Sequence, residues 1–435
     1  MRPPVQNPRR PAFGKSLFIQ GTGFGLGLAV HMLLSRWLGP ASYGDISVTL
    51  SVAQLAASFA ALGFSRFSIQ PVAQLGAANE GRAATSFARC ALLTVTASTL
   101  AVSVLLYVGT RAAEMLFDVD EHPIRYGALL VLPITFAPLL GGLLSGLRRP
   151  LLAQALNQFS GRALLLAGLV GLLFTAIPPS EELALELLTT TLVLPPVLLA
   201  LSLRQNWPAE WTPASPPGDQ WRAWRATARS YLVASLPMAA LAQSGIFLME
   251  LFHGNEGDVG TYAAAHRTAG LFFVVLAATR QLAVPELSAA KSEGPQALED
   301  RLRSNLRFMF GTGGALWLLF ALLGDEILTL FGHSTEKGHR LLILLATASL
   351  IYLVTGLAKP VLQLFGHHRL VIGSMMMLLG LTLLAGAMVI PVWGGEGLAA
   401  AQILVNLCVL GYLMRQVQRR TGLRYLSLLW SRPTP

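Results

Sequence analysis

The 435-residue chain has few charged side chains. Asp, Glu, Lys and Arg make up 12% of it, about half the share that is usual in a water-soluble domain. Hydrophobic residues make up 53%, and they gather in blocks long enough to cross a membrane. This pattern excludes a disordered chain, a fibrous protein and an ordinary water-soluble enzyme. It predicts an all-α polytopic membrane protein.

Cysteine and buried acid are also scarce. Cys90 and Cys408 both fall in apolar segments and lie far apart in the sequence, so they indicate neither a disulfide framework nor a metal site. The 22 Asp and Glu residues lie in loops or near the ends of apolar blocks. A deep carboxylate is the expected ion site of a cation-coupled antiporter, so its absence favours a cavity for anions. No cofactor or metal is expected, and a coupling ion (H+ or Na+) is left open.

Twelve apolar blocks predict twelve transmembrane helices. The predicted spans are 14–36, 45–65, 87–109, 127–147, 151–177, 183–203, 228–250, 259–281, 308–331, 341–362, 369–392 and 397–417. The predicted domains are a cytoplasmic tail 1–13, a six-helix bundle 14–204, a cytoplasmic linker 205–227, a second six-helix bundle 228–418 and a cytoplasmic tail 419–435.

The distribution of basic residues predicts which side of the membrane each loop faces. With the N-terminus inside, 25 of the 32 Lys and Arg residues fall in cytoplasmic segments, as expected because basic residues collect in the cytoplasmic loops of membrane proteins. Both termini are therefore predicted to be cytoplasmic. The net charge of +10 is explained by topology and needs no nucleic-acid partner. The tryptophan-rich segment 219–229 fits either a short helix on the membrane surface or a linker anchored by aromatic side chains.

Short motifs recur at a shift that drifts from 216 to 210 residues. Gly44 pairs with Gly260, and the prolines of 146–150 and 356–360 also match. Six predicted helices separate each pair, so the two halves should have the same orientation. This predicts two six-helix bundles related by a pseudo-two-fold axis along the membrane normal, with a site between the bundles.

Three motifs carry a resemblance to a known family. They are Leu38-Gly39-Pro40-Ala-Ser-Tyr43-Gly44, Gly63-Phe64-Ser65-Arg66 and Val259-Gly260-x-Tyr262-x-x-Ala265-x-Arg267. Together with the twelve helices, they resemble the polysaccharide (oligosaccharide) flippase branch of the multidrug/oligosaccharidyl-lipid/polysaccharide (MOP) exporter superfamily. The resemblance implies a MATE-like fold and a flippase of the bacterial cytoplasmic (inner) membrane. Its substrate would be an undecaprenyl-pyrophosphate-linked oligosaccharide, moved to the outer leaflet by alternating access for surface or exopolysaccharide biosynthesis.

Two alternatives remain. One is an ion-coupled small-molecule or drug antiporter of the same fold. The other is a membrane-embedded glycan polymerase or transferase, which the short outer loops disfavour; no enzyme activity is therefore expected. The expected partners are the lipid bilayer and a polyprenyl-pyrophosphate-linked glycan, with a polysaccharide polymerase or export complex left open.

Arg162 is the strongest candidate for substrate binding. A charged side chain inside a membrane span costs free energy and is typical of a functional cavity. Gln154, Gln158 and Arg162 recur at every fourth position and should form one polar stripe. A guanidinium group can bind pyrophosphate through two hydrogen bonds. The alternative is that the helix enters the membrane late, which would place Arg162 at the interface.

The other candidates are weaker. Arg267 can face a cavity or pair with Glu250, and His31 can either titrate or be structural. The glycines beside His31 favour close helix packing over a phosphate loop. The remaining predicted substrate-binding residues are amides: Gln20, Gln54, Gln243 and Asn406.

Overall fold

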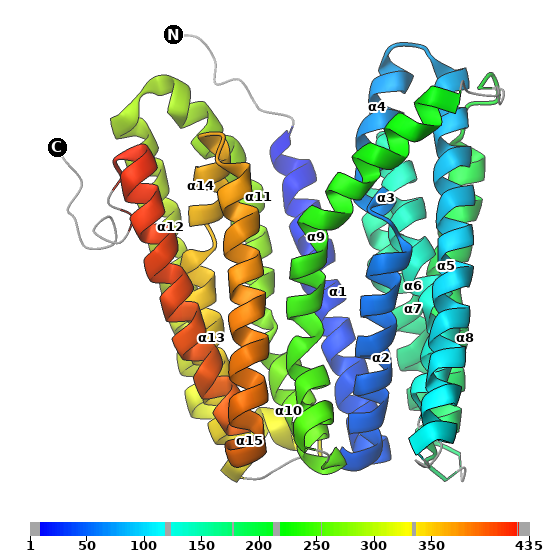
Figure 1. Cartoon of the computed structure of the whole chain (residues 1–435), viewed down its shortest axis with the longest axis vertical. Coiled ribbons are helices and arrows are strands. Elements are labelled where there is room, and N and C mark those ends of the chain that lie inside the picture. The colour runs from blue at the N-terminus through cyan, green and yellow to red at the C-terminus, as the bar shows by residue number, and fades with distance from the viewer. Residues whose placement is uncertain are drawn as a thin grey trace. The chain divides into compact units, whose positions relative to one another are not determined.

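A computed structural model describes residues 9–117, 123–175, 178–211, 218–253, 255–332, 336–423 and 425. These residues form helices and short connections, and no strand occurs among them (Figure 1). The helices are α1 (Arg9–Leu38), α2 (Pro40–Ala60), α3 (Phe64–Phe67), α4 (Ile69–Ala77), α5 (Gly81–Phe117), α6 (Ile124–Gly146), α7 (Pro150–Leu173), α8 (Glu181–Asn206), α9 (Gly218–His253), α10 (Glu256–Ala269), α11 (Leu271–Glu293), α12 (Pro295–Thr329), α13 (Glu336–Thr355), α14 (Ala358–Leu364) and α15 (His368–Thr421).

The described helices account for all twelve predicted spans. Ten stretches are long and apolar enough to cross a membrane, and α2 with α3–α4, bent by 63° at a short break, makes an eleventh. Gly394 has non-helical backbone angles within the 54-residue α15. It divides α15 into two arms of nearly 40 Å each at 1.5 Å per residue, so α15 supplies two spans. The chain is a multi-pass membrane protein, as predicted.

The contacts divide the chain into two compact units. The first contains residues up to Leu38 and Asp45–Gln243, and the second contains Gly39–Gly44 and the residues from Ser244 on. The division falls inside α9, whereas the sequence suggested a linker at 205–227. The segment 219–229 is helical and forms the first turns of α9, continuous with the rest of that helix.

The first half of α9 is held in the first unit by aromatic packing. Phe87 on α5 is fully buried and lies edge-on to Phe67 of α3 and to Trp224 of α9, with ring centroids 5.4 and 5.3 Å apart. Tyr231 of α9 packs on Phe67 at 5.5 Å. These rings bury a large apolar area at the N-terminal end of α9. Pro237 lies within α9, and Figure 1 shows the helix bent, as expected because proline breaks a helical hydrogen bond.

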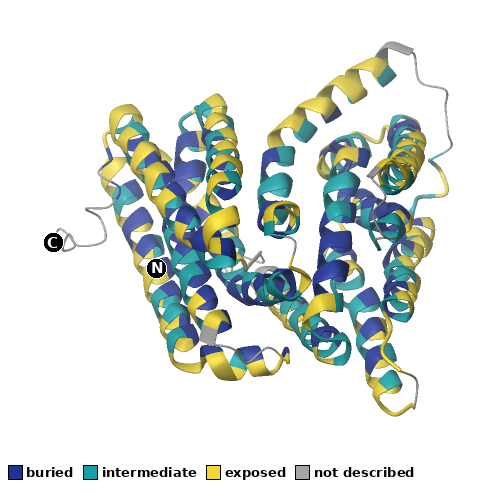
Figure 2. Cartoon of the chain, turned by 60° about the horizontal axis from the view of Figure 1, so that its bottom comes forward, coloured by how far each residue is buried: buried dark blue, intermediate teal, exposed yellow. Residues whose placement is uncertain are grey.

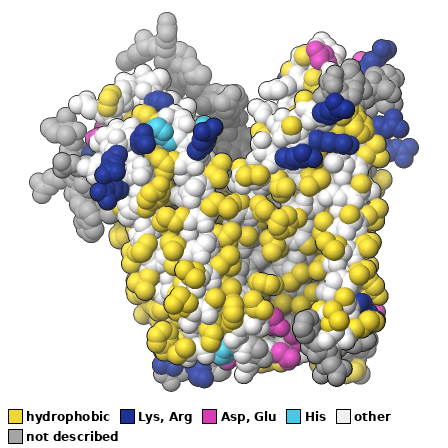
Figure 3. All heavy atoms as spheres, viewed as in Figure 1, with side chains coloured by type: hydrophobic (Ala, Val, Ile, Leu, Met, Phe, Trp, Pro, Cys, Tyr) yellow, Lys and Arg dark blue, Asp and Glu magenta, His cyan; other side chains and the backbone are white. Residues whose placement is uncertain are grey.

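Within each unit, buried residues lie on the faces where helices meet, and exposed apolar residues lie on the outward faces (Figure 2). Figure 3 shows an apolar belt on each unit, with Lys and Arg side chains gathered mainly beyond one edge of it. This is the surface that a membrane protein presents to lipid.

Tyr425 fastens the chain beyond the last span of the second unit. Its hydroxyl donates a hydrogen bond to the carbonyl of Val354 at 2.9 Å. Burial raises the pKa of Tyr425, so the hydroxyl keeps its proton and remains a donor.

Candidate functional site

Four of the predicted site residues meet where α1 packs against α7, inside the first unit. Ser16 Oγ donates to Gln154 Oε1 at 2.7 Å and accepts from Gln20 Nε2 at 3.4 Å. Two turns farther along α7, Arg162 Nη1 donates to the side-chain oxygen of Gln158. We call Ser16, Gln20, Gln154, Gln158 and Arg162 the polar seam.

Glycines on α1 make room for the seam. The Cβ of an added side chain at Gly23 would lie 2.8 Å from Gln158 Cβ, and one at Gly27 would lie 3.3 Å from Arg162 Nε. Two other glycines of this part of α1, Gly21 and Gly25, have no atom within 4 Å of such a Cβ. Glycine therefore acts here as a close-packing residue, as the sequence analysis favoured, but on one face of α1 only.

Arg162 is anchored at one nitrogen and remains partly accessible. Its Nη1 also donates to the backbone carbonyl of Gly23 at 2.9 Å, and the side chain as a whole is half-buried. A guanidinium group has five N–H donors, so an anchored Arg162 keeps donors for an anion. The seam thus combines one fixed cation with three amide side chains.

A second polar site lies between α2, α3, α6 and α9 of the same unit. It is a pocket of about 410 Å³, within the range of small-molecule sites. Two predicted residues close one end of it: Gln243 Nε2 donates to Gln54 Oε1 at 2.6 Å. We call this cavity the polar pocket.

The polar pocket has a cation at its other end. Along α2 the lining runs from Gln54 through Ser58, and past the helix break it continues to Ser65 and Arg66. α9 runs in the opposite direction, since Gly63 lies against the backbone at Leu232 whereas Gln243 meets Gln54. Arg66 is exposed, so its guanidinium is available to a ligand.

Sequence reasoning did not select Arg66 as a site residue, because it counted this side chain among the loop cations that orient the protein. The signal that could have found it is the Gly63-Phe64-Ser65-Arg66 motif. Gly63 has a positive φ of 81°, and the break that it permits turns Arg66 toward a cavity.

Two of the predicted residues, Asn406 and Arg267, belong to the second unit. Asn406 Nδ2 donates to the carbonyl of Ala348 at 2.9 Å, so it ties α15 to α13. Arg267 is half-buried on α10. His31, in the first unit, is half-buried on α1. The polar seam and the polar pocket, as defined above, do not include His31, Arg267 or Asn406, and the roles of these three residues stay predictions.

Two cations in the second unit make contacts inside it. Lys359 is only 3% exposed and lies within α14. Its Nζ is 3.3 Å from Tyr352 Oη and 3.3 Å from Met375 Sδ. Arg280 donates through Nε and Nη2 to the carbonyl of Gly356, at 3.0 and 2.9 Å.

The contact of Arg280 has a structural cause. The chain breaks between α13 and α14, and a helix break leaves backbone carbonyls without helical partners. The two matched prolines both follow a helix break, but Pro150 begins α7 whereas Pro360 lies inside α14.

Asp45 is the first residue of the predicted span 45–65. In the structure it is only 6% exposed, in the second turn of α2. A buried carboxylate is costly unless it has a specific function or specific contacts, so the membrane part of this chain is not free of buried acid.

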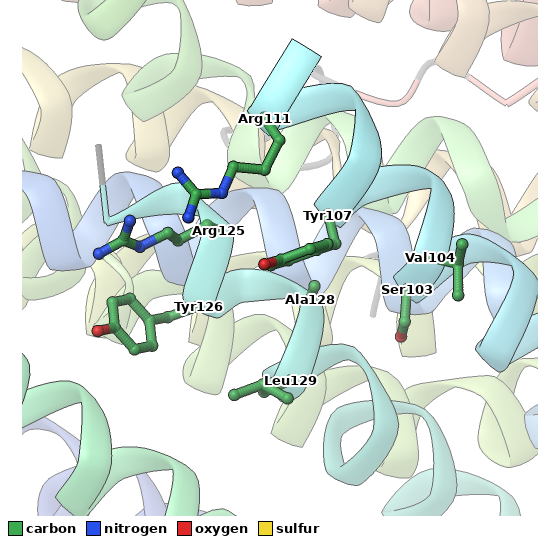
Figure 4. Close-up of a pocket in the computed structure, with 8 residues that line it drawn as sticks. All are labelled: Ser103, Val104, Tyr107, Arg111, Arg125, Tyr126, Ala128 and Leu129. Atoms are coloured by element: carbon green, nitrogen blue, oxygen red, sulfur yellow. The ribbon is translucent and has the colours of Figure 1, made fainter. Parts of the chain in front are cut away.

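A further cavity of about 600 Å³ lies where α5 ends and α6 begins (Figure 4). Its two cations have local contacts: Arg111 Nη1 is 3.3 Å from Glu114 Oε2, and Arg125 lies 5.4 Å from the centroid of the Tyr126 ring.

No known family model matches the sequence, and no curated protein is similar enough to count as a relative. Solved structures do match. An inward-facing MATE family multidrug resistance transporter of the MOP superfamily is 15% identical, with a TM-score of 0.71 over 93% of this chain and 99% of that one.

Two other solved structures are similar over almost their whole length. The lipid II flippase MurJ, in an inward closed conformation, is 14% identical with a TM-score of 0.70, over 96% of this chain and 90% of MurJ. The MATE multidrug transporter DinF-BH, solved in a complex, is 14% identical with a TM-score of 0.62, over 98% of both chains. The fold of this chain is therefore the one shared by MATE transporters and the flippase MurJ.

Proposed function

We propose that the chain is a flippase of the bacterial cytoplasmic membrane that moves a lipid-linked oligosaccharide, carried on undecaprenyl pyrophosphate, to the outer leaflet. The observation that carries the proposal is the polar pocket. It has a cation, Arg66, at one end, an amide pair at the other and hydroxyl groups between them. The likeness of the fold to MurJ supports a flippase, and its likeness to MATE transporters supports transport in general.

The pocket suits a sugar joined to a phosphate. Guanidinium groups bind phosphate through charge-assisted hydrogen bonds, whereas amides and hydroxyls both donate to and accept from sugar hydroxyls. Arg66 would hold the phosphate, and Gln54 with Gln243 would hold the sugar. The polar seam offers a second cation, Arg162, for the same headgroup as it passes through the membrane.

Flipping can be tested in proteoliposomes that contain a short polyprenyl-pyrophosphate-linked sugar with a fluorescent group on the sugar. Dithionite added outside bleaches only probe that reaches the outer leaflet. Arg66→Gln should slow flipping at least tenfold, because a hydrogen bond to a charged group contributes about 1.5–3 kcal/mol. Arg82→Gln is the matched control, since Arg82 is an exposed arginine at the start of α5 that does not line the pocket. Equal slowing of the two variants would contradict the proposal.

A second candidate function rests on Asp45. A buried carboxylate in α2 is the kind of group that an ion-coupled antiporter protonates or loads with Na+. Under this alternative, Asp45→Asn abolishes ion-driven efflux of a cationic dye, and Arg66→Gln leaves the efflux intact. The flippase proposal expects no dye efflux from the unmodified protein.

A further inference from the structure

A groove on the first unit has an amphipathic lining that neither the polar seam nor the polar pocket uses. It has a volume of about 1000 Å³ and lies between α5, α6, α8 and the residues just after α8. Its rim carries Arg89, Arg204, Trp207 and Trp211. Its floor is apolar and is formed by Leu92, Leu93, Phe136, Leu140 and Leu203. We call it the α5–α8 groove.

The rim is fixed by hydrogen bonds through Thr85. Thr85 Oγ1 accepts from Trp207 Nε1 at 3.1 Å and lies 3.0 Å from the carbonyl oxygen of Trp211. The two tryptophan rings meet edge to face, with centroids 5.6 Å apart. The segment after α8 is thereby held against the start of α5, and this contact brings the cations of two different helices to one rim.

The rim of the groove carries side chains that membrane proteins place where lipid headgroups meet the hydrocarbon. Arginine and tryptophan are the side chains that favour this interface. Phe136 lies ten residues before the end of α6, so the floor reaches about 15 Å below that end at 1.5 Å per residue, about half the thickness of a bilayer core. A flexible apolar chain of lipid length fits such a floor.

The groove is open to lipid. Leu93 on its wall is 53% exposed, and Leu201, next to the lining residue Ala200 on α8, is 51% exposed. Both guanidinium-bearing residues of the rim are exposed as well. Among the described lining residues there are two cations and no carboxylate, so the charge of the rim is complementary to an anionic headgroup.

We propose that the α5–α8 groove binds one anionic phospholipid, with its phosphate on Arg89 and Arg204 and one acyl chain along the apolar floor. Each basic residue near an anionic lipid surface strengthens binding by about fivefold. A zwitterionic phospholipid gains much less from two cations, because its phosphate is neutralised within its own headgroup. The site is thus selective for headgroup charge.

The test is native mass spectrometry of the full-length protein in detergent, titrated with phosphatidylglycerol or with phosphatidylcholine of the same acyl chains. The unmodified protein should retain phosphatidylglycerol in preference to phosphatidylcholine. The double variant Arg89→Gln/Arg204→Gln should lose affinity for it by about thirtyfold, from two cations. The matched control Arg82→Gln/Arg149→Gln removes two arginines that do not line the groove and should retain it.

Three results would overturn the proposal: equal retention of the two lipids by the unmodified protein, equal loss in the test and control double variants, or dimerisation in place of lipid binding. A second measurement does not depend on substitution. A photoactivatable phosphatidylglycerol should label peptides from 81–93 and 200–211, and labelling confined to other peptides would also contradict it. Neither readout involves transport, so failure here is separate from failure of the flippase proposal.

Discussion

The packing of α1 on α7 leads to a sharp prediction at Gly23. In Gly23→Ala the new methyl carbon would lie 2.8 Å from Gln158 Cβ, well inside the contact distance of about 3.5–4.0 Å between carbons. An extra methyl group in a packed interface costs about 1–3 kcal/mol, and alanine returns at most about 1 kcal/mol of helix propensity. In Gly25→Ala nothing lies within 4 Å of the added methyl. That variant therefore gains helix propensity without a steric cost.

We therefore expect Gly23→Ala to be less stable than Gly25→Ala by about 1–3 kcal/mol. For a unit of this size, each kcal/mol shifts the Tm by about 2–4 °C, so the two purified variants should differ by several degrees in thermal unfolding. Gln158→Gly, which removes the opposing Cβ, should reduce the penalty of Gly23→Ala in a double-mutant cycle. Gln158→Ala keeps that Cβ and removes only the Oε1 and Cγ contacts at 3.1 and 3.3 Å, so it should reduce the penalty less. Equal Tm values for the two glycine variants would refute the packing argument.

Two further predictions concern the cores of the two units. Phe87→Ala should lower the free energy of unfolding by about 3–5 kcal/mol, because Phe87 is fully buried; the exposed Phe59 gives the control Phe59→Ala, and equal effects in chemical denaturation would argue against the aromatic cluster. Lys359→Met should leave the Tm unchanged or raise it, because a hydroxyl and a thioether do not neutralise a buried ammonium group; a large fall in Tm would show that the charge stabilises the second unit.

The sequence was sufficient to predict the spans, because a membrane imposes one length and one polarity on every helix that crosses it. It also predicted that the glycines of α1 pack closely. It placed α6 and α7 correctly on either side of the Leu147–Arg149 turn. These features depend on local composition and on periodicity along a single helix.

Features that depend on tertiary packing could not be predicted from the sequence. The first turns of α9 look like a linker because they are polar, and their packing against Phe87 and Phe67 is a contact between residues far apart in the sequence. Arg66 and Lys359 look alike as cations at span ends. A helix break directs Arg66 to a cavity, whereas Lys359 is buried against Tyr352. The direction of a side chain at a helix break is set by the helices packed against the break. This direction cannot be predicted from a single sequence.

The most direct test of the account is a comparison of two substrates in the same proteoliposomes of the unmodified protein. One is a fluorescent polyprenyl-pyrophosphate-linked sugar, followed by dithionite bleaching. The other is ethidium, a cationic dye that serves as the probe for multidrug transport. The account predicts protein-dependent flipping of the lipid-linked sugar and no ion-driven movement of ethidium. Ion-driven movement of ethidium without flipping of the sugar would contradict it.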